Sequence, residues 1–338
     1  MDIKELKENA RERMKGFCAL CRECNGVWCA GNVPGMGGAG SGDTFKRNYE
    51  KLKEIKLVMR TIHDVDNPGL ECEIFGEKLS FPCLVAPITG TKFNMGGYVT
   101  DGEYSQDVVM GAIEAGTLAM VGDTGDPNCF MEGLKYIEQS GGKGIAIIKP
   151  RENSEIIARI KMAEKAGAKA VGIDIDGAGL VTMKLFGQPV GPKTLSQLKE
   201  LVESTKLPFI VKGILSSDEA ELCVEAGAKA IVVSNHGGRC LNETISSAEV
   251  LEEIVEAVGD KITVLVDGSV REGVDILKYL ALGAKGVLVG RPIIWGSIGG
   301  RQEGVKTVLE TLKAQLIQSM ILTGTSDVTN VRKRILKK

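Results

Sequence analysis

Histidine is scarce in this chain: His63 and His236 are the only two in 338 residues, so few side chains can serve as a base near neutral pH. Long apolar runs are missing too, and none approaches the roughly 20 residues of a membrane span. The 42 basic and 44 acidic residues nearly balance, which argues against a nucleic-acid-binding protein. The first residues alternate in charge without an apolar signal segment, so we expect a cytoplasmic protein.

Cysteine and glycine are abundant instead. There are nine cysteines, an odd number, in a chain with no visible export signal, so a disulfide framework is a poor interpretation. The chain has 43 glycines, well above the roughly 7% that is typical of proteins. That excess indicates many tight turns or loops that hold phosphate groups.

A repeating pattern begins near residue 80, in which a short apolar run is followed by an amphipathic stretch. The runs are continuous rather than alternating, as expected of parallel strands buried on both faces. The amphipathic stretches begin near Ser or Asp and end at Gly, as helices do. Eight βα units that close on themselves form a (β/α)8 TIM barrel, which we predict here; a doubly wound sheet is the alternative. The runs lie at residues 84–87, 118–121, 145–148, 170–175, 209–212, 230–234, 262–267 and 286–290.

The first 75 residues do not follow this pattern. A charged helix at about residues 3–16 leads into a cysteine-rich segment and the glycine-rich run GNVPGMGGAGSG. A second helix follows at about 44–53, and then a hairpin in ECEIFGEKLSFP. We therefore expect residues 1–75 to form an N-terminal extension that packs on a barrel made by residues 76–338.

The sequence SNHGGR, residues 234–239, stands at the end of the sixth predicted strand. In a TIM barrel, catalytic side chains lie at the carboxyl ends of the strands. His236 and Arg239 would place a base and a fixed positive charge on one tight loop, and the two glycines let the backbone turn without a Cβ clash. The alternative is a core histidine beside a surface arginine.

These residues resemble a known family. SNHGGR, then VDGSVREGVDILKYLALGAKGVLVGRP and IIWG, is similar to the FMN-dependent α-hydroxy-acid oxidases and dehydrogenases. That family includes glycolate oxidase, lactate oxidase and flavin-linked lactate dehydrogenase. The resemblance extends from about residue 44 to residue 324, and TFKRNYEKLKEIKLVMRTIHDVD and FPCLVAPI are similar to the family's N-terminal pattern.

The resemblance implies a catalytic role for four residues. His236 matches the base that takes a proton from the substrate while two electrons pass to the flavin. Arg239 matches the guanidinium that binds the substrate carboxylate, a geometry suited to arginine. Asp176 matches the carboxylate that orients the histidine. Lys212 matches the lysine beside flavin N1, where negative charge develops on reduction; a lysine that merely ends a strand is its alternative.

The resemblance also implies an FMN site. The loops after the seventh and eighth strands are where a barrel commonly binds phosphate, through backbone N–H groups and helix N-termini. Ser269 stands where the family has glycine, and the segment that passes the flavin ring is altered here. The implied FMN-binding residues are Pro87, Ile88, Thr89, Lys212, Ser234, Asp267, Gly268, Ser269, Arg271, Gly290 and Arg291.

Several substrate-side residues of the family are absent. Its two active-site tyrosines fall at about Pro34 and Ala146, and a glutamine falls at about Gly144. Its second carboxylate-binding arginine falls at about Met183, and a threonine near the flavin is replaced by Asp174. Lys149, Lys184 or an N-terminal group are the candidates to replace the missing contacts.

Four cysteines, Cys18, Cys21, Cys24 and Cys29, lie within twelve residues in a pattern foreign to the family. This spacing is compatible with a [4Fe–4S] cluster, although ferredoxin runs have three residues before the last cysteine. A structural zinc site and four free thiols are the alternatives. A metal cluster would offer the flavin's electrons a one-electron exit and so favour a dehydrogenase over an oxygen-using oxidase.

We therefore expect an FMN enzyme that oxidises an L-2-hydroxy acid such as lactate and passes the electrons to an unidentified acceptor. One alternative is a non-redox FMN enzyme like the type 2 isopentenyl diphosphate isomerases, against which SNHGGR argues. Another is a flavin-binding electron-transfer protein with a weakened substrate site. The resemblance further implies a homotetramer.

Overall fold

Eight parallel strands form the centre of the computed structural model, which describes residues 2–337. They are hydrogen-bonded in the order β4-β11-β10-β9-β8-β7-β6-β5, and a bridge between Val85 and Ala119 joins the two ends. This confirms the TIM barrel and all eight predicted strands. The strands are β4 Cys83–Val85, β5 Met120–Gly122, β6 Ile145–Ile148, β7 Ala170–Asp174, β8 Phe209–Ile214, β9 Ala230–Val233, β10 Thr263–Val266 and β11 Gly286–Val289.

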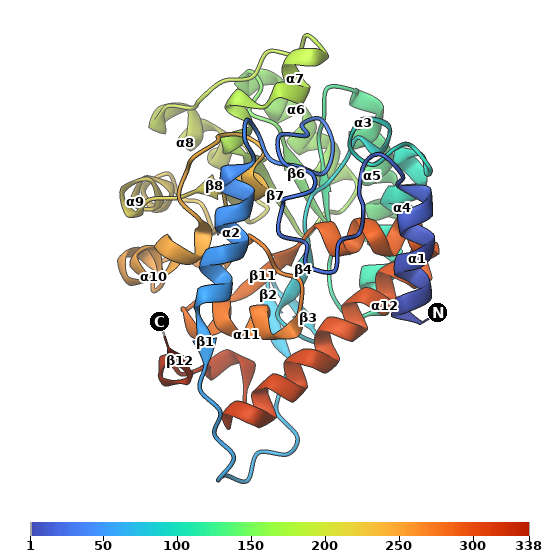
Figure 1. Cartoon of the computed structure of the whole chain (residues 1–338). Helices are drawn as coiled ribbons and strands as arrows, with labels where there is room; N and C mark the ends of the chain where they lie inside the picture. Colours follow the sequence, from blue (N-terminus) through green and yellow to red (C-terminus); the bar gives the residue numbers. More distant parts are fainter. Residues whose placement is uncertain (1, 338) are drawn as a thin grey trace.

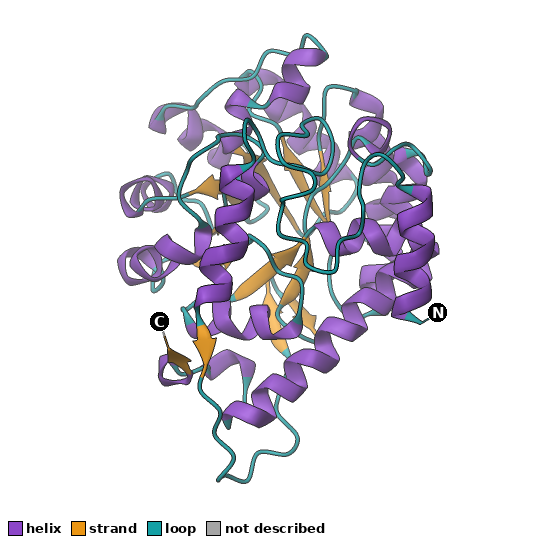
Figure 2. Ribbon diagram, viewed as in Figure 1, coloured by secondary structure: helices purple, strands orange, loops and turns teal. Residues whose placement is uncertain are grey.

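Helices surround the barrel, as Figure 2 shows. Most follow a strand, and several begin at a capping residue such as Thr100, Thr194 or Ser246, whose side chain pairs with the third helical residue. The last helix is interrupted at Arg301, which has a left-handed backbone. The helices of the barrel are α3 Thr91–Asn94, α4 Asp101–Glu114, α5 Pro127–Gln139, α6 Asn153–Lys165, α7 Val181–Leu185, α8 Leu195–Glu203, α9 Ser217–Glu225, α10 Ser247–Val258, α11 Gly273–Ala281 and α12 Arg291–Thr323.

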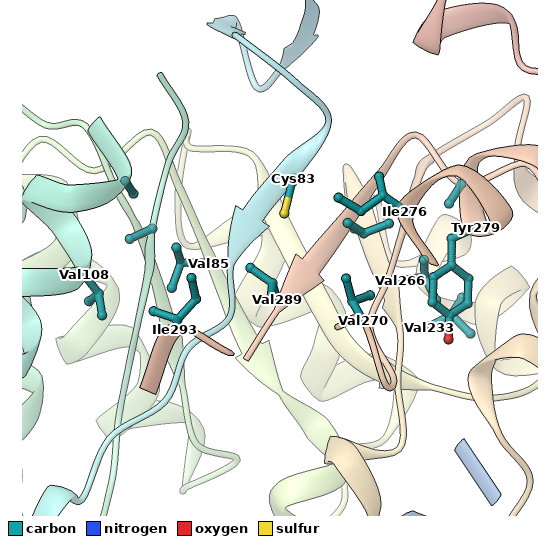
Figure 3. Close-up of a cluster of buried hydrophobic side chains, with 14 of the residues drawn as sticks. Cys83, Val85, Val108, Val233, Val266, Val270, Ile276, Tyr279, Val289 and Ile293 are labelled. Carbon is teal, nitrogen blue, oxygen red and sulfur yellow. The ribbon is translucent and has the colours of Figure 1, made fainter. Parts of the chain in front are cut away.

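The core has two layers because successive strand residues point to opposite faces of the sheet. Leu84 lies in the cluster inside the barrel, whereas its neighbours Cys83 and Val85 lie in the cluster between strands and helices. Figure 3 shows this outer cluster, in which Val289 and Ile293 pack near Val85. Because the strands are buried on both faces, their sequences are continuous apolar runs.

The N-terminal segment wraps one side of the barrel (Figure 1). Helix α1 (Ile3–Arg13) packs along α12, and α2 (Asp43–Glu54) packs against α10 and the loop after β9. The predicted hairpin forms from β2 (Cys72–Ile74) and β3 (Glu77–Leu79). Near the C-terminus, β1 (Lys56–Leu57) pairs antiparallel with β12 (Leu336–Lys337).

The order of the strands determines where functional side chains meet. All eight run in the same direction, so their carboxyl ends gather at one mouth of the barrel. Two short 3₁₀ helices, η1 (Ile175–Gly179) after β7 and η2 (His236–Gly238) after β9, lie at this mouth. Across residues 2–337, no helix combines the length and the apolarity needed to cross a bilayer.

Candidate active site

A pocket with an empty volume of about 970 Å³ opens at the carboxyl ends of the barrel strands. Most of the residues implied by the resemblance line it, so the barrel brings them together from strand β8 and from the loops after β4, β9, β10 and β11. Two of them, Asp176 and Ser234, stand behind the wall and contact residues that line it. The implied residues in the wall are Pro87, Ile88, Thr89, Lys212, His236, Arg239, Asp267, Gly268, Ser269, Arg271, Gly290 and Arg291.

His236 is held by its neighbours in one orientation. Its Nδ1 lies 2.9 Å from Oδ1 of Asp176, and its backbone N–H donates to Oγ of Ser234 at 3.0 Å. His236 has a left-handed backbone with φ of 58°, which turns its side chain into the pocket. Because Nδ1 is engaged by Asp176, Nε2 is the nitrogen available to accept a proton.

The glycines of SNHGGR allow a close approach between two parts of the chain. Gly238 has φ of 80°, and a Cβ atom there would lie 2.6 Å from the backbone nitrogen of Phe45. The loop is fixed by Asn235, which accepts from the Gly238 N–H at 3.1 Å and exchanges hydrogen bonds with Asn48 of α2. Helix α2 of the N-terminal segment therefore supports the His236 loop directly.

Arg239 joins the N-terminal segment to the barrel mouth. Its guanidinium donates to the carbonyl of Gly35 and, at 2.8 Å, to Oδ1 of Asn94. Burial lowers the pKa of Arg239. Asn94 also accepts from the backbone N–H of Gly35 at 3.2 Å, so one amide oxygen holds both groups. Gly35 and Asn94 line the pocket and were not predicted from the sequence.

Lys212 lies between carboxylates at the bottom of the pocket. Its Nζ is 3.3 Å from Oδ1 of Asp174 and 3.5 Å from Oδ2 of Asp267, and it donates to Oγ of Ser234 at 3.1 Å. Burial would lower the pKa of Lys212, but Asp174, Asp267 and Asp176 outweigh it and raise that pKa. The ammonium is therefore charged at neutral pH.

The loops after β10 and β11 bring hydrogen-bond donors to the pocket wall. Nε and Nη2 of Arg271 and Oγ of Ser269 are buried and have no hydrogen-bond partner within residues 2–337. Arg291 stacks on the Phe45 ring at 3.7 Å and donates to the carbonyls of Met36 and Gly237, both at 3.1 Å. Burial and the charges of Arg271 and Arg239 lower the pKa of Arg291 to about 10.

This donor set fits a phosphate group. Buried donors without partners cost free energy unless a ligand supplies acceptors, and phosphate oxygens are suited to guanidinium groups. Ser269 adopts a left-handed backbone with φ of 59° at the place of the family's glycine, so its backbone still makes the turn. The residues present therefore fit the phosphate end of FMN, and Lys212 lines the same pocket.

A comparison with protein families decides the assignment. The profile of the family described as FMN-dependent dehydrogenase matches residues 35–184 and 186–338. This chain belongs to that family. The resemblance inferred from SNHGGR is thereby confirmed, and FMN is the cofactor that the FMN-dependent dehydrogenase family uses.

Individual relatives in the FMN-dependent dehydrogenase family are similar over most of their length. An L-lactate oxidase of Nostoc sp. is 34% identical over 338 residues, covering 88% of this chain and 90% of that protein. A 2-hydroxyacid oxidase 2 of Bos taurus is 32% identical, covering 89% and 92%. A crystal structure of mandelate oxidase superposes with a TM-score of 0.82 at 27% identity, covering 99% of this chain and 97% of the other.

The cysteine segment lies outside the part that matches the FMN-dependent dehydrogenase family. Cys18 is buried, Cys21 is exposed, Cys24 and Cys29 are half-buried, and all four are free thiols. Burial raises the pKa of Cys18 to about 11. Within residues 2–337, the one group of three or more ligand-type side chains within 4.8 Å of each other is Asp176, His236 and Cys240. The predicted iron–sulfur or zinc site therefore has no support.

Of the two lysines proposed to replace lost family contacts, only one reaches the pocket. Lys149, at the end of β6, lines the wall, and its Nζ lies 2.5 Å from Oδ2 of Asp174. Lys184 is exposed on α7. The Lys149–Asp174 pair could have been predicted from the strand order, because β6 and β7 are neighbours and the two residues stand at their carboxyl ends.

Proposed function

We propose that this protein oxidises an L-2-hydroxy acid, of the size of lactate, to the 2-oxo acid. The observation that carries the proposal is the His236–Asp176 pair beside Arg239 in one pocket with the FMN-binding residues. The names of the relatives, L-lactate oxidase and 2-hydroxyacid oxidase among them, support the same substrate class.

The chemistry requires the acid to lose two electrons and two protons from its C2–H and O–H bonds, which leaves a C2=O double bond. FMN, when bound, supplies the acceptor for both electrons and one proton. His236 takes the other proton, the one from the hydroxyl group, through Nε2. Asp176 keeps the imidazole in position and stabilises the imidazolium that forms.

The remaining groups bind and orient. Arg239 would bind the carboxylate, which brings C2 of the substrate to His236. Lys212 offers positive charge where the electrons arrive, and Arg271 with Arg291 anchors the phosphate. Gly35 and Met36 of the N-terminal segment line the same pocket, and the Met36 carbonyl accepts from Arg291.

The electron acceptor is a separate matter. The preference for a dehydrogenase over an oxygen-using oxidase depended on a metal cluster at Cys18, Cys21, Cys24 and Cys29, which has no support. Most of the relatives are named oxidases, and one is named a dehydrogenase. The rate at which reduced enzyme is reoxidised by air, against that with a quinone or a dye, distinguishes the two. The homotetramer and the cytoplasmic location stay predictions.

The test is an anaerobic absorbance spectrum of the FMN-loaded protein before and after addition of L-lactate, glycolate or L-mandelate. Bleaching of the flavin bands by an L acid, and not by D-lactate, is the expected result. Flavin bands that persist with every acid would contradict the proposal and favour the isomerase or the electron-transfer protein. A spectrum with the acid but with the inactive His236→Gln variant is the control.

A further inference from the structure

Asp174 is a buried carboxylate that lies close to two lysines and a histidine. It ends β7, is 2% exposed, and lies between the ammonium groups of Lys149 and Lys212. Nδ1 of His236 is also only 3.5 Å away. Burial raises the pKa of Asp174, but the charges of His236, Lys149 and Lys212 outweigh it and hold that pKa well below its usual range. The carboxylate is therefore ionised at neutral pH.

The proposed catalytic residues do not account for the negative charge of Asp174. The family resemblance predicts a neutral threonine at this position, and His236 already has Asp176 as its partner. An ionised carboxylate that is buried costs several kcal/mol unless cations pair with it. The chain meets that cost with Lys149 on the neighbouring strand β6 and Lys212 on β8, whose register places it opposite Asp174.

The position of Asp174 bears on the charge that Lys212 offers to the flavin. Two carboxylates face Nζ of Lys212: Asp174 at 3.3 Å and Asp267 at 3.5 Å. In a buried site, each negative charge reduces the electrostatic stabilisation that a nearby cation gives to an anion. Reduction of FMN by two electrons and one proton makes the ring anionic, so charges near the ring adjust its electronics.

We propose that Asp174 sets the reduction potential of the bound FMN by opposing the positive charge of Lys212. The ionised carboxylate makes the anionic reduced flavin less stable than it would be beside a neutral side chain, which lowers the potential. Lys149 acts in the opposite sense, because it neutralises part of the Asp174 charge. The proposal depends on Lys212 lying near the flavin ring, and it does not depend on which substrate the enzyme oxidises.

A merely structural role for Asp174 predicts something different. If the carboxylate only anchored two lysines, both Asp174→Asn and Lys149→Met would destabilise the fold, with no systematic change in the flavin. The electrostatic role predicts changes of opposite sign in the two variants. Asp174 thus acts through Lys212, and its effect is measured on the cofactor rather than on activity.

The experiment compares wild type, Asp174→Asn, Lys149→Met and the double variant, each loaded with FMN. The midpoint potential is measured by slow enzymatic reduction against a reference dye, and sulfite affinity by absorbance titration, because the sulfite adduct also leaves the ring anionic. Asp107→Asn is the matched control. Asp107 is a buried carboxylate on α4 that accepts from Ser297 and Arg301 away from the pocket wall.

In Asp174→Asn we expect a higher potential and a sulfite Kd lower by about tenfold, equal to about 1.4 kcal/mol. In Lys149→Met we expect a lower potential and weaker sulfite binding. The double variant should fall between them, and Asp107→Asn should match wild type. These signs follow from removing one negative or one positive charge near an anionic ring.

Unchanged potential and sulfite affinity in Asp174→Asn would overturn the proposal, as would shifts of the same sign in both single variants. If Asp174→Asn does not retain FMN, Lys149→Met decides, and a potential equal to or above that of wild type contradicts the proposal. No hydroxy acid enters these measurements. If the proposed oxidation is wrong and this proposal is right, hydroxy acids will leave the flavin unbleached, while its potential will still change in Asp174→Asn.

Discussion

Oδ1 of Asp176 lies 2.9 Å from Nδ1 of His236, while Oδ2 of the same carboxylate is buried without a hydrogen-bond partner among residues 2–337. The Asp176 carboxylate thus pairs with the imidazole and is not shared among several donors. It comes from the turn after β7 and the imidazole from the turn after β9, so two strand ends that are separated by β8 meet at the mouth of the barrel.

This pair leads to the first prediction. His236→Gln should slow the reduction of FMN by a hydroxy acid by 10² to 10⁴-fold, roughly the contribution of a general base. Asp176→Asn should cost on the order of 10²-fold, because the imidazole keeps its place but loses the charge that stabilises it. Stopped-flow absorbance under anaerobic conditions measures both rates.

His63 provides the matched control for these variants. It is the other histidine of the chain, is exposed, and contacts the carbonyl of Arg60 at 2.8 Å far from the pocket wall. In the His63→Gln variant, the hydroxy acid should reduce FMN at the wild-type rate. If His236→Gln also retained the wild-type rate, His236 would not be the base.

Arg239 gives the second prediction. Arg239→Met should raise the Kd for the hydroxy acid by about 10- to 100-fold, since a hydrogen bond to a charged group contributes about 1.5–3 kcal/mol. Arg239→Lys should retain part of the affinity but lose the two-pronged geometry. Anaerobic titration of the flavin spectrum measures the Kd. Lys184→Met, which removes one exposed charge from α7, should leave it unchanged.

The barrel and much of this site could be predicted from the sequence because their signals are local. Parallel strands buried on both faces appear as continuous apolar runs, as at Ile145–Ile148, and SNHGGR places His236 and Arg239 on one turn. The contacts of Arg239 with Gly35 and Asn94 have no such signal. They depend on the path of the irregular segment between α1 and α2, which has no hydrophobic period.

The cysteine segment shows that the spacing of cysteines in a sequence does not by itself predict a metal site. Cys18, Cys21, Cys24 and Cys29 are close in sequence, but a metal also needs their sulfurs to converge, and the four thiols differ in burial. Cys18 faces the core while Cys21 faces solvent. The Asp174–Lys149 pair, by contrast, follows from strand order once the barrel is known, because neighbouring parallel strands bring their carboxyl ends together.

The third prediction concerns the phosphate end of the pocket. Arg271→Met should weaken FMN binding by about 10- to 100-fold, because Nε and Nη2 of Arg271 are buried donors that await an acceptor. Riboflavin, which lacks the phosphate, is the control ligand, and its affinity should be nearly the same in wild type and variant. Fluorescence quenching of either flavin on titration with apoprotein gives both values. An equal loss for both flavins would show that Arg271 supports the fold of the pocket rather than the phosphate.

The fourth prediction is a pH dependence of stability at the contact between α2 and α10. Glu249 accepts from Nε and Nη2 of Arg47 at 2.8 and 2.7 Å and from the backbone N–H of Ser246 at 3.0 Å. Burial alone would raise the pKa of Glu249, but these hydrogen bonds outweigh it and lower the pKa to about 2. A group whose pKa falls on folding stabilises the protein above its unfolded pKa, about 4.3 for glutamate.

We therefore expect Glu249→Gln to lower the free energy of unfolding by about 1 kcal/mol at pH 7. The figure is small because Arg47 is 42% exposed at its side chain, and because glutamine still accepts from Ser246 in the capping box. The difference from wild type should shrink as the pH falls from about 4.3 towards 2, since wild-type Glu249 then takes up a proton. Urea unfolding at several pH values measures it, with Glu256→Gln, an exposed change on the same helix, as control. A difference that stayed constant down to pH 2 would show that the Glu249 charge does not stabilise this contact.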